Sequence, residues 1–524
     1  MKIWLLVAMT FILRTAYCQP GTLDKSFGHN GLVDPKYEYV YGVGRTVLIQ
    51  DDGKIILVGQ TFYTYNCLMV RYLKNGMIDS SFGINGIVST TFAGGYSKGS
   101  PIAALQKDGK IVVVGIYPAF DNESPTISRY LPNGKIDSGF GVNGLVHKVF
   151  PSKRVFGEAI GIEPDGKIVI AGQVMNPDES YAVARCTVNG EIDTTYGNNT
   201  GRIQTTFSNN VNQAWTMTVQ PDGKVIVGGR ASVPTNDFAL LRVTASGKID
   251  SSFGEDGKVT TDFCNSEDQA NSIAVQADGK IIVAGEVVCG SYYNYGLSRY
   301  LNNGHLDSSF GINGKVITDF NGYDDYATSV AIEPNGKIVV GGVSFSTFDP
   351  ESGDFAIIQY KTNGEPDSTF GSNGKAVTDF HGRQDWAYSV ALQKDGKIIV
   401  GGFAGTSDHT GFALARYYGD ECIAANNCSN IKSLLKNNNI TISSLKLFPD
   451  PVKTILTVSL KSPVAKPLQI NISDIYGKLY KAISWNTYKG ANIKELDVSF
   501  LKNGIYILKI VNDSAFLTLK FLKE

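Results

Sequence analysis

The chain has 524 residues, which is too long for one compact core and predicts at least two folded units. Its formal net charge is −1 and only 19% of its residues are charged, so it offers no basic footprint for nucleic acid or an acidic membrane surface. Glycine is abundant, at 57 residues, and aromatic residues reach 11%, which favours an all-β protein with many turns.

The amino terminus has the pattern of a secretory signal peptide. Lys2 precedes a short apolar run, and Ala16 and Cys18 suit a cleavage site after residue 18. The run is too short to anchor the chain across a bilayer, and no other stretch is apolar enough to do so. We therefore expect a signal peptide over residues 1–18. In the alternative, a lipoprotein acylated at Cys18, the bulky Tyr17 stands where a small residue is wanted.

One segment recurs seven times between residues 21 and 418. Each copy carries a turn dipeptide, a lysine, an apolar run and a glycine, as in DGKIIVGG at 395–402. A steady period of this length indicates a repeat architecture. The steps of 56, 57, 57, 56, 57 and 60 residues separate the turn glycines Gly53, Gly109, Gly166, Gly223, Gly279, Gly336 and Gly396.

Each copy contains four β-rich runs, here called a, b, c and d. In the sixth copy they are KVITDF, SVAIE, KIVVGG and FAIIQY. Asp-Gly, or Asn-Gly once, stands between b and c and supplies the positive φ angles of a two-residue hairpin turn, so b and c are antiparallel. Seven copies of four antiparallel strands predict a seven-bladed β-propeller over residues 19–418.

The chief alternative is an open solenoid, which needs distinct capping units at both ends. The array begins just after the turn that follows strand d and stops at that same turn, so its two ends complete each other. This arrangement favours a closed ring.

A second set of residues also recurs in each copy. Each aspartate of this set precedes Ser-Phe-Gly or a near variant, and each arginine lies eight residues before the next aspartate. Arg416 has no aspartate after it, but Asp24 would take that place in a closed ring. A ring of aspartates that handles metal or protons is one interpretation; we favour a structural turn cap paired to arginine. The residues are Asp24, Asp79, Asp137, Asp193, Asp250, Asp307 and Asp367, with Arg71, Arg129, Arg185, Arg242, Arg299 and Arg416, and Gln359 in place of one arginine.

The segments DGKIIVGG, FALARY and LDSSFGINGKV together resemble the delta-60 repeat family of exported bacterial proteins. The resemblance covers roughly residues 21–418. It implies a propeller-like repeat domain and supplies no catalytic residues.

The register breaks after Tyr418. Residues 419–443 are rich in Asn and Ser and indicate a linker. Alternating apolar and polar residues over 444–524 predict a small Ig-like β-sandwich of about seven strands. Its segments PDP at 449–451, DIYGK at 474–478 and LKNGIY at 501–506 resemble the type A C-terminal sorting domain of the type IX secretion system.

That resemblance implies export to the cell exterior or outer-membrane surface, with the secretion translocon and its sorting peptidase as partners. An ordinary adhesive sandwich is the alternative for this second unit.

Six cysteines remain after the expected processing, and an exported protein meets oxidising surroundings. Cys264 and Cys289 follow strands that should end on the same side of one repeat. Cys422 and Cys428 could close a small loop. Cys67 and Cys186 lie in strand-like runs and are expected to be buried free thiols.

Recognition is expected on the face that carries the a–b and c–d loops, because the c–d loops differ in every copy. The alternative is that these loops are simply solvated. Stacking tyrosines beside carboxylates suit a glycan or a protein ligand. The candidate residues are Tyr292, Tyr293, Tyr295, Tyr323, Asp324, Asp325, Tyr326 and Trp386, with Phe348, Asp349 and Glu351.

Catalytic patterns are weak. Asp324-Asp325 and Glu267-Asp268 are paired carboxylates of the kind glycoside hydrolysis needs, but no separation is fixed by the sequence. The five histidines are scattered without metal-ligand spacing, and no cofactor motif occurs. The sequence thus favours a secreted, non-enzymatic binding module without a metal or cofactor; an extracellular glycan hydrolase or lyase on a propeller scaffold is the alternative.

Overall fold

A computed structural model gives the structure of the chain as two compact units, Met1–Ile423 and Ala424–Glu524. It describes residues 19–35, 40–62, 64, 66–91, 101–117, 124–147, 149–150, 154–175, 179–208, 211–233, 235–405, 410–420, 444–448, 452–462, 465–474, 478–512 and 515–523. The expected signal peptide, residues 421–443 of the linker with Cys422 and Cys428, the PDP motif and residues 475–477 of the DIYGK motif lie outside these residues.

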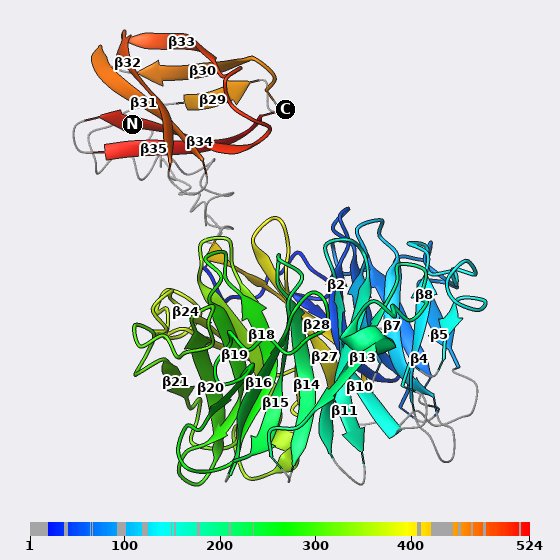
Figure 1. The fold of residues 1–524 in the computed structure, drawn as a ribbon. Coiled ribbons are helices and arrows are strands. Elements are labelled where there is room, and N and C mark those ends of the chain that lie inside the picture. The colour runs from blue at the N-terminus through cyan, green and yellow to red at the C-terminus, as the bar shows by residue number, and fades with distance from the viewer. Residues whose placement is uncertain are drawn as a thin grey trace, which may run out of the picture. The chain divides into compact units, whose positions relative to one another are not determined.

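The first unit is a ring of seven four-stranded antiparallel sheets, which confirms the predicted seven-bladed propeller (Figure 1). The first strand of each sheet packs against the first strands of both neighbouring sheets and is therefore the inner one. From inner to outer strand, the sheets are β2 (Val43–Ile49), β3 (Ile55–Gln60), β4 (Cys67–Tyr72), β5 (Ile87–Thr90); β6 (Ile102–Leu105), β7 (Ile111–Tyr117), β8 (Ser124–Tyr130), β9 (Leu145–Val146); β10 (Arg154–Ile162), β11 (Ile168–Met175), β12 (Ser180–Cys186), β13 (Arg202–Thr205); β14 (Asn212–Val219), β15 (Val225–Ser232), β16 (Asn236–Val243), β17 (Lys258–Thr261); β18 (Asp268–Val275), β19 (Ile281–Val288), β20 (Tyr293–Tyr300), β21 (Lys315–Thr318); β22 (Asp325–Ile332), β23 (Ile338–Phe345), β24 (Gly353–Tyr360), β25 (Lys375–Thr378); and β26 (Asp385–Leu392), β27 (Lys397–Gly405), β28 (Thr410–Tyr418), β1 (Leu32–Val33).

Blade and sequence repeat are offset by one strand. The run called a pairs with strand d of the preceding copy, as β21 does with β20, and not with the b run that follows it. The d–a link (301–314) turns the chain back so that a pairs antiparallel with d, whereas the a–b segment (319–324) crosses from the outer edge of one sheet to the centre of the next. Each blade therefore borrows its outer strand from the next copy.

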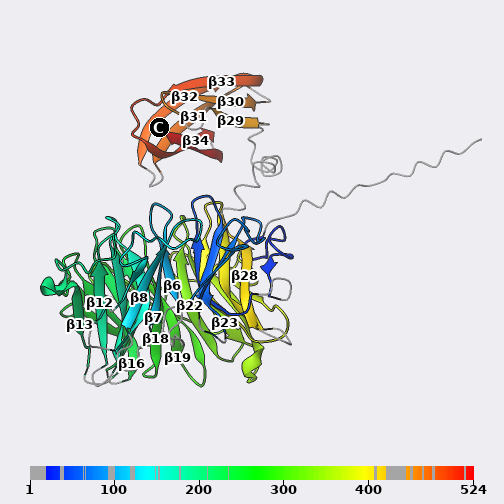
Figure 2. The ribbon, with the colours of Figure 1, turned by 90° about the vertical axis from the view of Figure 1, so that its right-hand side faces the viewer.

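The offset explains how the ring closes. The last copy has no successor, so β1 from the amino-terminal end supplies the fourth strand, with Leu32 opposite Ala415 and Val33 opposite Leu414. Further backbone bonds run from Gly21 N to Tyr418 O (2.7 Å) and from Asp24 N to Arg416 O (2.8 Å). Figure 2 shows blue and yellow strands side by side at this seam.

The hairpin between strands b and c differs from the expected two-residue turn. In the first blade, Gly53 N donates to Gln50 O and Gln50 N donates to Lys54 O, which encloses three residues. Only the glycine has a positive φ, 81° at Gly53, while Asp52 stays in the ordinary region and accepts the Lys54 N–H through its side chain. A three-residue loop of this kind places just one residue in the left-handed region.

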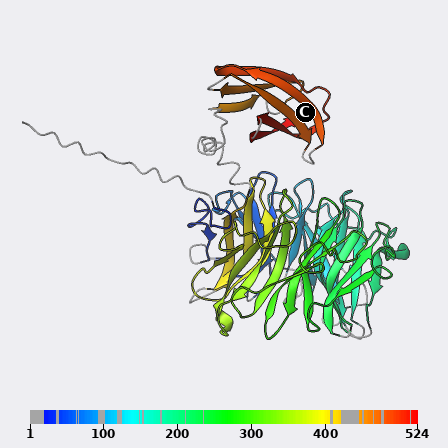
Figure 3. The same ribbon diagram turned by 90° about the vertical axis from the view of Figure 1, so that its left-hand side faces the viewer.

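The core of the ring lies between the sheets. One cluster joins Ile226 and Phe238 of the fourth blade to Ile281 and Val283 of the fifth, all fully buried. Equivalent clusters fill the other gaps between neighbouring blades, which stand side by side around the ring (Figure 3). Removal of this apolar area from water stabilises the ring as a whole.

The recurring Arg and Asp residues form a buried tie between adjacent blades. In the first blade, Arg71 Nε donates to Asp79 Oδ2 (2.9 Å), Nη1 donates to Pro132 O of the next blade (2.6 Å), and the guanidinium lies over Phe82. The lysine of the DGK turn completes it, with Lys54 Nζ 3.1 Å from the same carboxylate. Burial alone would raise the pKa of Asp79, but its hydrogen bonds, from Ser81 first, lower it to about 2.

The tie recurs at Arg129, Arg185, Arg242 and Arg299 with Asp137, Asp193, Asp250 and Asp307. In the closing blade, Arg416 Nη2 lies 2.8 Å from Asp24 Oδ2 across the seam. In the sixth blade, Gln359 donates to Glu333 instead, and Lys337 pairs with Asp367. These residues sit at turns between blades, where the structure gives them packing partners on every side.

The second unit is a sandwich of a three-stranded and a four-stranded antiparallel sheet, in line with the predicted seven strands. Leu456 and Ile470 from the two sheets meet in its buried core, together with Trp485. The sheets are β29 (Ser444–Phe448), β30 (Ile455–Ser462) and β33 (Gly490–Asp497), and β32 (Leu479–Thr487), β31 (Lys466–Asp474), β34 (Gly504–Asn512) and β35 (Ala515–Lys523).

Two short helical segments lie wholly within the described residues, η1 (Gly197–Gly201) and η2 (Pro350–Ser352). Neither they nor any other described helix has the length and apolar character needed to cross a membrane.

Candidate functional site

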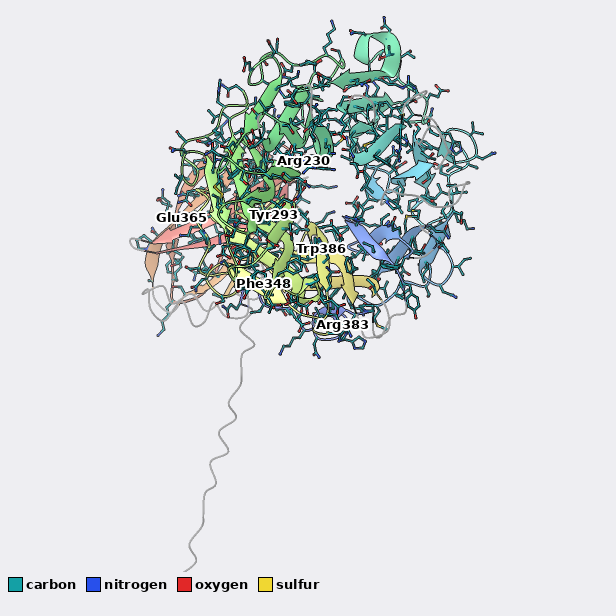
Figure 4. The ribbon with its side chains drawn as sticks, turned by 90° about the horizontal axis from the view of Figure 1, so that it is seen from below. Arg230, Tyr293, Phe348, Glu365, Arg383 and Trp386 are labelled. Atoms are coloured by element: carbon teal, nitrogen blue, oxygen red, sulfur yellow. A yellow bond between two sulfur atoms is a disulfide. The ribbon has the colours of Figure 1, made fainter. Side chains whose placement is uncertain are left out.

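A cavity of about 580 Å³ lies at the centre of the ring, where the first halves of the inner strands meet. Every inner strand contributes to its wall, from Arg45 on β2 to Tyr388 on β26. Figure 4 looks onto the ring from below: Arg230, Tyr293 and Trp386 stand toward its centre, whereas Phe348, Arg383 and Glu365 lie farther out. We call this cavity the channel pocket.

The channel pocket is built by one repeated irregularity. In six blades, the pairing of the inner strand with its neighbour skips one residue, which is the signature of a β-bulge. A bulge bends the strand and redirects the extra side chain, and all six extra residues line the pocket. They are Arg45, Glu158, Trp215, Asn271, Thr328 and Tyr388.

The six bulge residues are chemically all different, although the residues around them repeat. The residue before is always Gly or Ala, and the residue after is always Ala, Ser or Thr. A purely structural position should hold one residue type in every blade, as the Asp of the inter-blade tie does. The residues that flank the bulge thus repeat because they build the ring, whereas the bulge residue itself differs from blade to blade around the pocket.

Aromatic side chains form a continuous row along one side of the pocket. Tyr293 lies 5.2 Å from Tyr326, Tyr326 stacks on Trp386 at 5.6 Å, and Trp386 stacks on Tyr388 at 6.1 Å, measured between ring centroids. The guanidinium of Arg45 ends the row, 3.8 Å from the centre of the Tyr388 ring. Flat rings arranged in this way offer faces for stacking and for C–H contacts.

Two hydrogen-bond donors on this wall have no partner among the described residues. They are Trp386 Nε1 and Arg45 Nε, both removed from solvent. Buried polar atoms are nearly always hydrogen-bonded in native proteins, so an unpartnered donor in a cavity needs an explanation such as a bound molecule. These two donors lie at the same aromatic row.

Two carboxyl groups also line the pocket, Glu158 on β10 and Glu286 on β19. Burial raises the pKa of Glu158 to about 7, with Arg45 opposing the rise. Burial likewise raises the pKa of Glu286 to about 7; Arg230 opposes this and Asp324 adds to it. Both groups therefore change charge near neutral pH.

Glu158→Gln is expected to flatten the pH dependence of stability between about pH 4.5 and pH 7. The pKa of Glu158 is 4.5 in the unfolded chain and about 7 in the folded protein. Between these two pH values, the folded protein keeps a proton that the unfolded chain releases. Its contribution to stability is full below pH 4.5 and is lost as the pH rises to 7. Urea unfolding across this range should show a smaller decline for the variant than for the wild type. Exposed Glu267→Gln serves as the control and should follow the wild type.

Five of the residues predicted for ligand binding belong to two groups of aromatic side chains. Tyr293, Tyr326 and Trp386 belong to the aromatic row. Tyr292 and Tyr323 form a second group farther out with Phe348, whose side chain is 77% exposed; the centroids of Tyr323 and Phe348 are 5.0 Å apart. Asp324 accepts the Tyr293 N–H through Oδ1 (2.9 Å) and so holds the row in place.

Two of the predicted ligand residues are buried and cannot meet a ligand on this face. Tyr295 is 1% exposed, and its hydroxyl donates to Ala356 O of the next blade at 3.2 Å. It points to the same side of β20 as Tyr293 but lies one row deeper, where the neighbouring sheet covers it. Asp325 is fully buried and accepts the Phe320 N–H (2.7 Å), which caps the a–b loop. Neighbouring Asp324 and Asp325 thus accept hydrogen bonds from two different backbone groups.

The cysteines divide as their positions suggest. Cys264 and Cys289 form a disulfide that ties the a–b loop to the end of β19. Cys67 and Cys186 are buried and unpaired.

Two groups of three aspartates in the described residues have the spacing of metal ligands: Asp237, Asp262 and Asp268, and Asp354, Asp379 and Asp385. Neither group can be recognised from the sequence, since its members come from three separate segments. Glu158, Glu286 and the bulge residues are likewise not among the predicted site residues. The spacing of apolar residues does indicate the bulge. In ATSV at 327–330, the buried residues Ala327 and Val330 are three positions apart, whereas a regular strand buries every second residue.

Seven segments of the chain match the family described as "Domain of unknown function (DUF5122) beta-propeller", at residues 50–82, 106–140, 163–196, 220–253, 276–310, 333–370 and 393–420. Residues 446–524 match the "Secretion system C-terminal sorting domain". The chain carries a DUF5122 β-propeller and a secretion sorting domain. Both assignments confirm the resemblances seen in the sequence. The sorting domain indicates export by the type IX secretion system to the cell exterior or cell surface.

Solved structures similar to this chain include a protein of unknown function from Dyadobacter fermentans, at 12% identity, with 61% of this chain and 94% of that chain covered and a TM-score of 0.39. A PL25 ulvan lyase matches at 12% identity, 73% and 94% coverage and a TM-score of 0.40. An α-L-arabinanase from Cellvibrio cellulosa matches at 10% identity, 64% and 95% coverage and a TM-score of 0.30. At these TM-scores, none of them carries an argument about this chain. No curated protein matches it.

Proposed function

We propose that the exported propeller is a non-enzymatic binding module that holds an oligosaccharide in its channel pocket. The observation that carries the proposal is the ring of six different bulge residues around one cavity, on a scaffold that otherwise repeats. The repeated residues build the ring. Because the residues that differ lie on the wall of one cavity, they favour recognition of an irregular ligand there.

The chemistry of the wall fits a sugar better than a protein segment. The row from Tyr293 to Tyr388 offers stacking faces, while Trp386 Nε1 and Arg45 Nε are donors without partners among the described residues. Carboxyl groups at Glu158 and Glu286 can accept hydroxyl protons. Alternating flat apolar faces and spaced donors and acceptors match the two faces and the rim of a pyranose ring.

Trp386→Ala is expected to weaken oligosaccharide binding by roughly tenfold, since loss of one stacked ring face and one donor removes about 1.4 kcal/mol. The probe is a library of oligosaccharides screened against the purified protein, followed by calorimetry on the best ligand. Phe348→Ala is the matched control, because it removes an exposed ring from the outer group and should leave affinity within twofold. A larger loss with Phe348→Ala, or none with Trp386→Ala, would contradict the site.

A glycan hydrolase or lyase is the second candidate function. Glu158 and Glu286 favour it, because two carboxyl groups with pKa values near 7 in one cavity could serve as acid and base. The same ligands should therefore be incubated with the protein and assayed for new reducing ends or unsaturated products. Turnover that disappears in both Glu158→Gln and Glu286→Gln would replace the binding module with an enzyme.

A further inference from the structure

Three carboxylates meet where the fourth blade joins the fifth. Asp237 lies near the start of β16, Asp262 directly follows β17, and Asp268 opens β18. One oxygen of each lies within 4.8 Å of the others. Oxygen ligands of Ca²⁺ lie about 2.3–2.6 Å from the ion, so any two of them are at most about 5 Å apart. The three side chains are thus already spaced as ligands of one ion.

Asp268 brings a buried oxygen that the protein does not satisfy. The residue is 2% exposed; its Oδ2 accepts the Phe263 N–H (2.7 Å), while Oδ1 is buried and lacks a hydrogen-bond partner among the described residues. Asp237 Oδ1 accepts from the Thr235 hydroxyl, and Asp262 Oδ1 accepts from Asn265 N. Neither of these donors serves Asp268. An unpaired buried carboxylate oxygen is costly unless a cation meets it.

The net negative charge of the group favours a divalent cation. One basic side chain lies beside it: Lys315 Nζ donates to the backbone oxygen of Asp262 and lies over the Phe263 ring at 5.5 Å. Three carboxylates and one ammonium leave a net charge of −2. Burial raises the pKa of Asp268 to about 7; the Phe263 and Val288 N–H groups oppose this rise, and the charges of Asp262 and Asp237 add to it.

The same arrangement recurs between the sixth and seventh blades. Asp354, Asp379 and Asp385 occupy the corresponding positions, and their oxygens also lie within 4.8 Å of one another. Here Leu32 takes the place of the lysine, since its strand closes the ring. Asp385 is fully buried, and burial together with Asp354 and Asp379 raises its pKa to about 8 in spite of N–H donors at Phe380 and Gly405.

The junction between these two also has a buried oxygen without a hydrogen-bond partner among the described residues, Oδ1 of Asp325, but it lacks the third carboxylate. Asn294 stands at the first position, with Asp319 and Asp325 at the others. Its amide nitrogen donates to Tyr292 O at 3.0 Å, which satisfies the side chain within its own loop. The fold thus accepts Asn at this position, so a comparison of neighbouring blades separates ion binding from folding.

We propose that the propeller binds two calcium ions, one at Asp237, Asp262 and Asp268 and one at Asp354, Asp379 and Asp385. Carboxylate oxygens at strand ends, with water completing the shell, suit Ca²⁺, whereas Mg²⁺ demands a tighter octahedral set. Asp268 and Asp385 directly precede Gln269 and Trp386 of the channel pocket. Each ion fixes the backbone at the start of an inner strand and so positions the pocket wall. The proposal does not depend on the identity of the ligand in the pocket.

The test is calcium titration of the purified, EDTA-stripped protein by calorimetry. We expect two ions per chain with Kd values of about 0.1–1 mM, in the range of extracellular modules. Asp237→Asn and Asp354→Asn copy the natural Asn294 and should each remove one ion, and the double variant should bind none. Asn294→Asp should add a third. Thermal midpoints measured in EDTA establish that the variants are folded.

Calcium should also raise the thermal midpoint of the wild type and leave that of the double variant unchanged. Asp325→Asn is the matched control, because Asp325 caps its loop as Asp268 does but belongs to the junction with two carboxylates; its stoichiometry should stay at two. Absence of binding up to about 10 mM Ca²⁺, or a stoichiometry unaffected by Asp237→Asn and Asp354→Asn, would overturn the proposal.

Discussion

Arg416→Ala is expected to lower the free energy of unfolding of the propeller by about 3–5 kcal/mol, the range for breaking a buried ion pair by removing one partner. Arg416 joins the two ends of the ring: Nη2 lies 2.8 Å from Asp24 Oδ2, Nη1 donates to Lys74 O, and the guanidinium covers Phe27 at 4.4 Å. Asp24 is fully buried and would keep its charge with Lys397 as its remaining basic partner. The measurement is chemical denaturation followed by fluorescence.

Arg299→Ala is the matched control for this prediction. Arg299 makes the same tie inside the ring, with Nε 2.9 Å from Asp307 Oδ2 and the guanidinium 4.5 Å from Phe310, but no chain end depends on it. Both variants should lose similar stability. Hydrogen exchange should additionally speed up over residues 21–33 in Arg416→Ala and not in Arg299→Ala. A loss below about 1 kcal/mol for Arg416→Ala would show that the tie is not needed for closure.

Removal of the disulfide between Cys264 and Cys289 is expected to lower the free energy of unfolding by about 3.5 kcal/mol. The bridge closes a loop with a sequence separation of 25, and the stabilisation follows from the reduced freedom of the unfolded chain. The suitable variant is Cys264→Asn with Cys289→Ser. It copies Asn321 and Ser346, which occupy these positions in the next blade, so the folded state tolerates both side chains.

Dithiothreitol provides the control for the disulfide. It should lower the denaturation midpoint of the wild type to that of the double variant and leave the variant unchanged, since Cys67 and Cys186 are unpaired. Equal midpoints of wild type and variant without reductant would contradict the prediction.

Much of the fold follows from local chemistry that the sequence displays. The period of the turn glycines gives the number of blades, and the mutual fit of the two array ends gives closure, because the links between copies are short and alike. The eight-residue step from Arg299 to Asp307 likewise shows as a recurring pair. Such features depend on neighbours in the chain or on repetition, both of which can be seen without coordinates.

The channel pocket could not be predicted in the same way. Its wall depends on bulges, and one extra residue in a strand exchanges the sides to which the following side chains point. Tyr293 and Tyr295 share one side of a strand, and only the depth of the next sheet decides that Tyr295 is covered. The aspartate groups combine three segments each, so their spacing in sequence resembles no metal motif. The predicted loop of the b–c hairpin is one residue too short, because Asp-Gly suits both loop lengths.

The offset between blade and sequence repeat has a genetic consequence. Because each repeat of about 57 residues gives three strands to one sheet and one to the sheet before, every junction between repeats is bridged by backbone hydrogen bonds. Duplication or deletion of one whole repeat, wherever its breakpoints fall, joins equivalent positions and recreates the same junction. The ends at the seam need no change. The repeats are therefore alike at their junctions, while each copy carries a different residue at its bulge.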